Sequence, residues 1–149
     1  MTMDRRAEMS AEATDEFLGA NETGVLSLAR ADEPYAIPVS YGYDPSARQF
    51  YMRLVSAENS DKRAFVASGR DARLVVYDGD GDAYRSVVAT GELSRIDPEE
   101  LTAADIRQYG EAKRPLFEVW PEGKGDLDIE LYRLNPDTVS GRSVSVSRE

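Results

Sequence analysis

Residues 34–54 read PYAIPVSYGYDPSARQFYMRL, a stretch with the pattern of two β-strands joined by a turn. Residues 34–43 are rich in strand-forming side chains, but they include Pro38. A proline predicts a strand at a sheet edge or at a bulge, where a missing amide donor costs little. The segment DPSA at 44–47 has the composition of a turn. In residues 50–55, apolar and more polar side chains alternate, which predicts a strand with one apolar face.

The rest of the chain continues this pattern of short strands, with turn residues between them. We expect a mainly β protein, a small barrel or sandwich with six or seven strands and two or three peripheral helices. No repeat or linker divides the sequence, so residues 1–149 are expected to form a single domain. The other expected strands are 25–29, 72–77, 86–96 with a bulge at Gly91, 127–134 and 138–147, and the expected helices are 10–19, 60–68 and one that starts at 97.

The composition is strongly acidic. Asp and Glu number 28 against 18 Lys and Arg, and only three of the bases are lysines, so the net charge is −10. This balance is typical of proteins from salt-loving archaea, because at molar salt the Debye length falls to roughly 3 Å and self-repulsion is screened. The alternative is an ordinary acidic cytosolic protein. The charge argues against a nucleic acid as the main partner.

The sequence has no long apolar run and no apolar segment of the signal-peptide kind at its start, so we expect no membrane association and a cytoplasmic location. It also contains neither cysteine nor histidine. This excludes disulfides, thiolate chemistry, an imidazole base and the histidine ligand of haem. We therefore expect no metal site.

Cations gather in residues 51–73, where five bases face three acids within an otherwise acidic chain. Ser60 is suited to cap a helix, and Lys62 and Arg63 then lie in its first turn. Free amide hydrogens at a helix start, a hydroxyl and cations together can bind a phosphate. The alternative is that these bases pair with neighbouring carboxylates.

Three smaller features have less specific interpretations. The acidic run at 78–82 lacks the residues of a calcium-binding loop and is interpreted as a hairpin turn. Ser140-Gly141-Arg142 is expected to form a turn before the last strand, with an anion-binding nest as the alternative. Tyr41 and Tyr43 lie on one face of their strand, which favours packing in the core or an interface.

The serial order of these pieces is similar to that of a known family. TGVLSLA (23–29), PYAIPVSYGYD (34–44), QFYMRL (49–54), Ser60-Asp61-Lys62 and ARLVVYD (72–78) are followed by SVVATGELSRI (86–96). This order resembles the pyridoxamine 5'-phosphate oxidase-like family of FMN-binding split barrels, in its short, nitroimidazole-reductase-like branch. The resemblance spans residues 12–96, and LDIELYRLNPDTVSGR adds to it.

The resemblance implies a Greek-key split barrel that forms a homodimer with flavin at the interface. Strand Ile37-Pro38-Val39-Ser40 would lie along the flavin ring, and Tyr51, Met52 and Arg53 would line the path from ring to phosphate. Ser60 and Lys62 would hold the phosphate, and Ser86 would reach the flavin of the partner subunit. Members of the family often have basic residues where Tyr41 and Asp61 occur in this chain, so part of the usual phosphate site is missing.

The implied activity is that of an FMN-dependent oxidoreductase that reduces a small organic acceptor or oxygen. A flavin carries this chemistry itself, which agrees with a chain that lacks histidine and cysteine. The resemblance identifies no catalytic side chain. The alternative is a non-enzymatic protein that binds or carries flavin or a deazaflavin coenzyme, and a third possibility is an interaction domain with a vestigial pocket.

Overall fold

The computed structural model describes residues 4–57, 70–103 and 127–146. The expected helix at 60–68, and with it Ser60 and Lys62, lies outside the described residues. The described elements are β1 (Asp4–Glu8), α1 (Ala11–Ala20), β2 (Thr23–Arg30), β3 (Glu33–Ser40), β4 (Gly42–Asp44), β5 (Gln49–Ala57), β6 (Arg70–Asp80), β7 (Ala83–Ile96), the 3₁₀ turn η1 (Pro98–Glu100) and β8 (Leu127–Val146).

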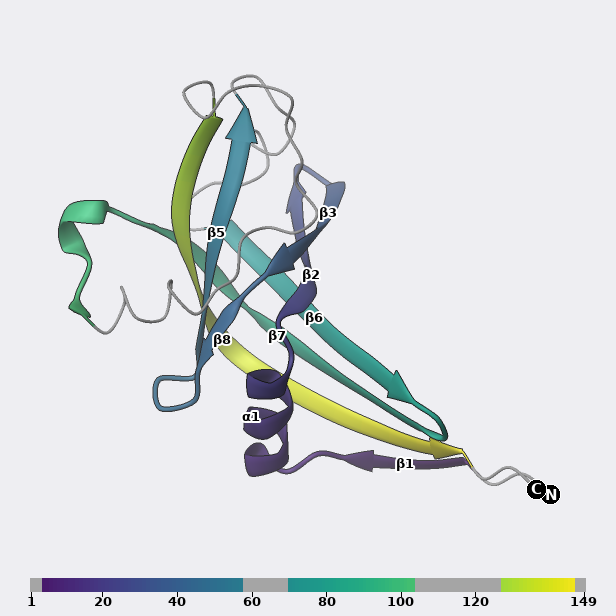
Figure 1. Cartoon of the computed structure of the whole chain (residues 1–149). Helices are drawn as coiled ribbons and strands as arrows, with labels where there is room; N and C mark the ends of the chain where they lie inside the picture. Colours follow the sequence, from purple (N-terminus) through teal and green to yellow (C-terminus); the bar gives the residue numbers. More distant parts are fainter. Residues whose placement is uncertain (1–3, 58–69, 104–126, 147–149) are drawn as a thin grey trace.

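The eight strands form one antiparallel sheet in the order β3-β2-β6-β7-β8-β5-β4, and β1 pairs with β8. The sheet curls until β3, at one end of this order, contacts β5 near the other end (Figure 1). Two edges that approach without forming a ladder are consistent with a split barrel. The mainly β fold class expected from the sequence is therefore confirmed.

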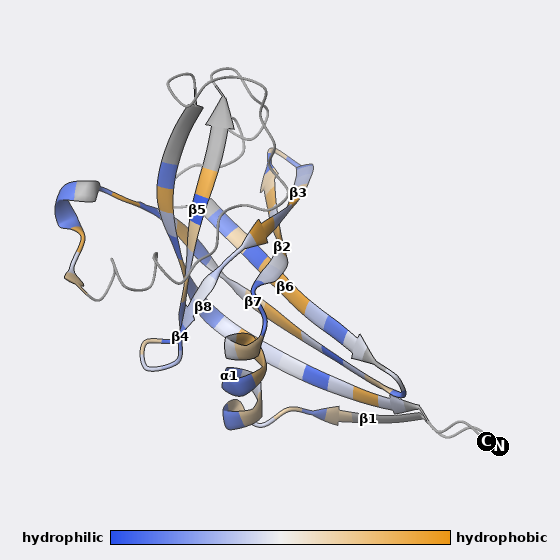
Figure 2. Cartoon of the chain, viewed as in Figure 1, coloured by the Kyte–Doolittle hydropathy of each residue, from blue (hydrophilic) through white to orange (hydrophobic). Residues whose placement is uncertain are grey.

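Alternation along the strands separates a core from an outer face, as the alternating colours along β6 and β8 in Figure 2 illustrate. On β6, for example, Leu74 and Val76 are buried and Arg73 and Tyr77 are exposed. The largest fully buried side chains come from six elements, which gives a continuous core: Phe17, Leu18, Leu26, Phe50, Met52, Leu74, Val76, Val87, Leu93 and Leu134.

Helix α1 packs against β4 beside the barrel. Ser10 caps it as the sequence predicts, since its Oγ accepts a hydrogen bond of 3.1 Å from the amide of Ala13. Phe17 and Leu18 point into the core, and the guanidinium of Arg85 on β7 lies 4.9 Å from the centre of the Phe17 ring. The bounds predicted for this helix therefore agree with the structure to within one residue.

The C-terminal strands differ from expectation. Residues 127–134 and 138–147 were expected to be separate strands, with a turn at Ser140–Arg142, but one continuous strand, β8, spans both. That turn prediction is wrong because residues 138–142 pair with β7 throughout. Strand β1 was not expected either, since its polar residues DRRAE form a strand only by pairing with the end of β8. The expected strand at 34–43 is also divided, into β3 and β4. Two added strands and one merger give the eight strands of the described residues, instead of six or seven.

Three local predictions are confirmed. Pro38 lies on β3, which among the described strands pairs only with β2 and so forms an edge of the sheet. Gly91 marks an irregularity where the register between β7 and β8 shifts, and a side chain there would overlap the backbone of Asn135. The acidic run at 78–82 contributes to a hairpin whose two loop residues are Gly81, with φ +62°, and Asp82.

The paired ends of β6, β7 and β8, together with β1, extend away from the barrel as an arm (Figure 1). Asp4 pairs with Val146, so the first and last described residues lie side by side at its tip. Its side chains are mostly exposed, including Tyr77 and Tyr84. Among the described residues, no helix has the length and apolar character needed to cross a bilayer.

Candidate functional site

The outer face of β5 carries the first group of predicted site residues. Tyr51 is 3% exposed and packs with Ile96 of β7 and Leu131 of β8, apart from the main core. Arg53 lies opposite Leu131 in the β5–β8 ladder, which places its side chain on the same face, with Nε buried. We call Tyr51, Arg53, Ile96 and Leu131 the β5 patch. It combines mostly buried apolar side chains with a cation beside them.

The second group, on β3, alternates between the two faces of the sheet. Val39 is a core residue and Ile37 packs against the core, whereas Pro38 is exposed on the outer face. Met52 of β5 belongs to the same core as Val39. The side chains of Val39 and Met52 are thus occupied by packing, and their backbone is the part that can face a ligand. Ser40, the last residue of β3, is buried.

Ser86 lies far from the β5 patch, on the outer face of the arm. It pairs with Tyr77 of β6 on one side and with Arg142 of β8 on the other. We call Tyr77, Ser86 and Arg142 the arm row. Tyr77 is 68% exposed and lines a cavity of about 360 Å³ with Pro38 and residues 23–25.

The other end of the arm row borders a smaller cavity. Arg142, Ala7, Glu8 and Val144 line this space of about 190 Å³ between β8 and β1. Sequence reasoning did not single out Tyr77, and considered Arg142 as part of a turn, with an anion-binding nest as the alternative. The two-residue loop at 81–82 was an available signal, because it fixes the pairing of Tyr77 with Ser86.

The separation of these two groups follows from the ladder of β8. Arg53 pairs with Leu131 and Ser86 pairs with Arg142, so eleven residues of β8 separate the two positions. At about 3.3 Å per residue this is roughly 36 Å of strand. Within one chain, the β5 patch and the arm row are therefore well separated along β8.

The cations of residues 51–73 do not all gather in one place. Arg53 is on β5 and Arg73 is on β6, and strands β7 and β8 lie between them in the sheet. Lys62 and Arg63 lie outside the described residues. The expected cluster is thus divided at least between these two arginines.

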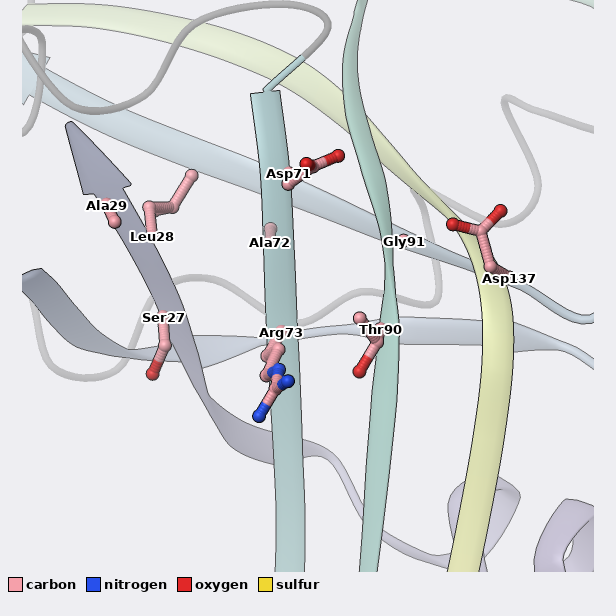
Figure 3. A pocket seen from close by; sticks show the side chains of 9 residues that line it. All are labelled: Ser27, Leu28, Ala29, Asp71, Ala72, Arg73, Thr90, Gly91 and Asp137. Carbon is pink, nitrogen blue, oxygen red and sulfur yellow. The ribbon is translucent and has the colours of Figure 1, made fainter. Parts of the chain in front are cut away.

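Arg73 lines a third cavity, of about 430 Å³, with Ser27 of β2 and Thr90 of β7 (Figure 3). These three residues are cross-strand neighbours, and Figure 3 shows their side chains pointing the same way. Asp71 and Asp137 also line this cavity. Two carboxylates against one guanidinium do not favour a phosphate, so this cavity is not the expected phosphate site.

Tyr41 and Tyr43 anchor α1 and face the core, as expected from their shared strand face. The Tyr41 hydroxyl donates to the carbonyl of Leu18 at 2.8 Å, and the Tyr43 hydroxyl donates to Asp15 Oδ1 at 2.5 Å. Burial, followed by the charge of Glu22, raises the pKa of Tyr41 well above its ordinary value. Burial and then the hydrogen bond to Asp15 raise the pKa of Tyr43 in the same direction. Both residues are structural, and neither offers a cation to a ligand.

Comparisons with solved structures support the fold. An FAD-binding protein from Mycobacterium smegmatis is 18% identical, with a TM-score of 0.67 over 93% of this chain and 98% of the other. An FAD-binding protein from Mesorhizobium loti is 21% identical, with a TM-score of 0.67 over 97% and 99%. A protein from Mycobacterium smegmatis that binds FAD and haem is 19% identical, with a TM-score of 0.61 over 97% and 74%.

A search of curated proteins finds no significant match to this chain. The sequence profile of one family, described as pyridoxamine 5'-phosphate oxidase, matches residues 10–143. This match includes every strand from β2 to β7 and most of β8. The chain therefore belongs to the pyridoxamine 5'-phosphate oxidase family.

Proposed function

We propose that this chain is an FMN-dependent oxidoreductase that works as a homodimer and reduces a small organic acceptor or oxygen. The observation that supports the proposal most strongly is the division of the candidate residues between the β5 patch and the arm row. Roughly 36 Å of strand separates them in one chain. If both contact one flavin, we expect a second copy to supply one of them.

The β5 patch suits a flavin in chemical terms. Tyr51 and Ile96 are almost fully buried, so the partly buried Leu131 is the apolar side chain with surface to offer, and Arg53 adds a cation on the same face. A flavin mononucleotide has a planar ring at one end and a phosphate at the other, so it needs both kinds of contact. When bound, the flavin would supply the hydride or electron transfer. The protein side chains would bind and orient it, with Ser60 and Lys62 as further phosphate contacts.

The outer face also suits a second copy of the chain. Val25, Val75 and Val88 are cross-strand neighbours there and form a half-buried apolar row. Exposed Tyr77 lies on one side of this row and exposed Arg73 on the other. An apolar centre with a more polar rim is the usual composition of a subunit interface. Pairing through this face would carry the arm row of each protomer toward its partner.

A protein that carries a flavin or a deazaflavin without turnover is the second candidate. The absence of histidine and cysteine does not separate this candidate from the enzyme, because a flavin supplies the redox chemistry itself. In the carrier case the protein would not reduce a small-molecule acceptor.

One experiment tests these proposals in sequence. The purified protein, supplied with FMN or with a deazaflavin, should show the bound chromophore by absorbance after gel filtration, at the mass of a dimer. Anaerobic bleaching by a nicotinamide cofactor, followed by reoxidation with oxygen or a small organic acceptor, supports the enzyme. Stable colour without bleaching supports the carrier, and failure to bind either chromophore contradicts both.

We further propose that the protein works in the cytoplasm of a halophilic cell. The support is the net charge of −10 with only three lysines among the bases. Such a surface repels itself at low ionic strength and is screened at high ionic strength.

A further inference from the structure

We infer that the cavity lined by Arg73, Asp71 and Asp137 binds a small aliphatic zwitterion, with a carboxylate at one end and an ammonium group at the other. The inference goes beyond the proposed flavin chemistry and does not rest on it. The cavity lies on the outer face beside the half-buried valine row, so it would border the proposed subunit contact. Strands β7 and β8 separate Arg73 from Arg53 of the β5 patch.

A guanidinium between two hydroxyls forms one end of this cavity. Arg73 on β6 lies directly opposite Ser27 of β2 on one side and Thr90 of β7 on the other. Residues in such a row share a face, and Figure 3 shows the three side chains pointing the same way. A guanidinium recognises a carboxylate through paired N–H donors, and hydroxyls beside it can donate as well. This end therefore suits a carboxylate.

Two carboxylates form the other end. Asp71 of β6 and Asp137 of β8 line the cavity, and Figure 3 shows them on either side of Gly91. Glu92 lies directly opposite Asp71 in the ladder between β6 and β7 and adds a third acid close to this end. Acids gathered in this way attract a cation and repel a second anion. An ammonium group, which has three donors and no acceptor, matches such a set of carboxylates.

A bulge in β8 explains how Asp137 comes to line the cavity. Thr90 pairs with Thr138 and Gly91 pairs with Pro136, so Asp137 is the extra residue on β8. Bulges re-aim side chains and are frequent next to active sites. The strands can approach here because Gly91 has no β-carbon, which would overlap the backbone of β8. The irregularity in the ladder thus coincides with the acidic end of the cavity.

The opposite charges that line the cavity do not pair with each other. In the part of the chain that the structure describes, none of Arg73, Asp71 and Asp137 forms an ion pair. Arg73 and Asp71 are two residues apart, which is roughly 7 Å along a strand. Figure 3 shows their charged groups pointing away from each other, which lengthens the gap further. A ligand that carries both charges at a matching distance can contact both ends at once.

This gap determines the kind of zwitterion. An α-amino acid carries its two charges on neighbouring atoms of one short unit, so it can contact one end only. Between the ends lies the row of Leu28, Ala72 and Gly91, which presents no polar side chain. The volume of about 430 Å³ is in the usual range for small-molecule sites. The expected ligand is therefore an ω-amino acid, in which a short methylene chain joins the ammonium and carboxylate groups.

An NMR titration at constant ionic strength tests the inference with four probes. These are 5-aminopentanoate, pentanoate without the ammonium group, butylamine without the carboxylate, and glycine with both charges close together. Because the site is open to solvent, each charge should contribute about threefold to fivefold to the Kd, so 5-aminopentanoate should bind more tightly than the other three. The amide signals of Ser27, Arg73 and Thr90 should shift. Equal binding of all four probes, shifts confined to other residues or no binding at all would overturn the inference.

Variants assign the two ends of the ligand. Arg73→Gln should raise the Kd of 5-aminopentanoate to that of butylamine and leave butylamine itself unchanged. Asp71→Asn combined with Asp137→Asn should weaken both of these ligands and spare pentanoate. Arg142→Gln is the matched control, since Arg142 is another exposed arginine of the outer face but lines a separate cavity. If Arg73→Gln binds 5-aminopentanoate as tightly as the wild type and Arg142→Gln do, the inference is wrong.

Discussion

At the scale of single residues, Arg53 is the side chain on which the flavin proposal depends most. It lies beside the apolar side chains of Tyr51, Ile96 and Leu131 and would meet the phosphate end of the cofactor. Arg53→Ala combined with Lys62→Ala should therefore weaken FMN binding by about tenfold or more and riboflavin binding much less. Calorimetric titration of both ligands measures the difference. Equal losses for the two would show that these residues do not contact the phosphate.

Tyr41 offers a second test at this scale, directed at stability. Its hydroxyl donates to the carbonyl of Leu18 within the core, so Tyr41→Phe would leave that carbonyl without this donor. Such a loss costs about 1–3 kcal/mol of the free energy of unfolding. Tyr77→Phe is the matched control, because Tyr77 is 68% exposed and its change should stay within about 0.5 kcal/mol. Urea denaturation of both variants provides the comparison, and equal effects would contradict the structural role of Tyr41.

The same tyrosines predict how stability depends on alkaline pH. Burial raises the pKa of Tyr41 and Tyr43 in the folded chain, while the unfolded chain releases these protons near pH 10. Above that pH the folded state holds more protons than the unfolded state, so stability should fall as pH rises and should not change for this reason below about pH 9. Unfolding curves measured from pH 8 to pH 11 test this. The decline should be shallower in the Tyr41→Phe, Tyr43→Phe double variant.

At the scale of elements, the bulge at Gly91 bends the long ladder between β7 and β8. A β-carbon at this position would overlap the carbonyl of Asn135 and the Cα of Pro136, which are backbone atoms that cannot rotate away. Gly91→Ala should therefore destabilise the fold by about 1–3 kcal/mol or more. Gly19→Ala in α1 is the control, because that side chain would meet nothing within 4 Å, and helix propensity favours it by about 0.5–1 kcal/mol. A thermal midpoint for Gly91→Ala equal to that of the wild type would show that the close approach of β8 does not require a glycine.

Elements whose pattern is local could be predicted from the sequence. The cap at Ser10, the edge strand at Pro38 and the bulge at Gly91 each depend on the residue itself and its near neighbours. Strand β1 and the continuity of β8 depend on pairing between the two ends of the chain. Local sequence patterns do not indicate such a pairing, because polar strands of this kind form only against the edge of an existing sheet.

The same difference between local patterns and long-range pairing applies to the candidate site. Alternation along β5 correctly separates Met52, which packs in the core, from Tyr51 and Arg53, which face outward. The link between Ser86 and Arg142 depends on the register across the Gly91 bulge, which sequence alone does not fix. For that reason the family resemblance indicated Ser86, whereas its neighbour Arg142 was recognised only in the folded sheet.

At the scale of the whole molecule, the net charge of −10 determines how the fold should respond to salt. Like charges on a compact surface repel one another, and the repulsion decreases when the chain unfolds, so low salt should destabilise the folded state. As the Debye length shortens from about 10 Å at 0.1 M to about 3 Å at 1 M, this penalty should disappear. We expect the thermal midpoint to rise with KCl over this range, by about 2–4 °C for each kcal/mol recovered.

A charge-neutralised variant separates this screening from the general strengthening of apolar burial by salt. Glu16, Glu33 and Asp137 are exposed, and replacing them with Gln, Gln and Asn removes three negative charges from the surface. If repulsion is the cause, this variant should melt at a higher temperature than the wild type at 0.1 M KCl and gain less from added salt. Parallel salt curves for the two proteins would assign the effect to apolar burial, and a midpoint that falls with KCl would contradict the halophilic interpretation of the surface.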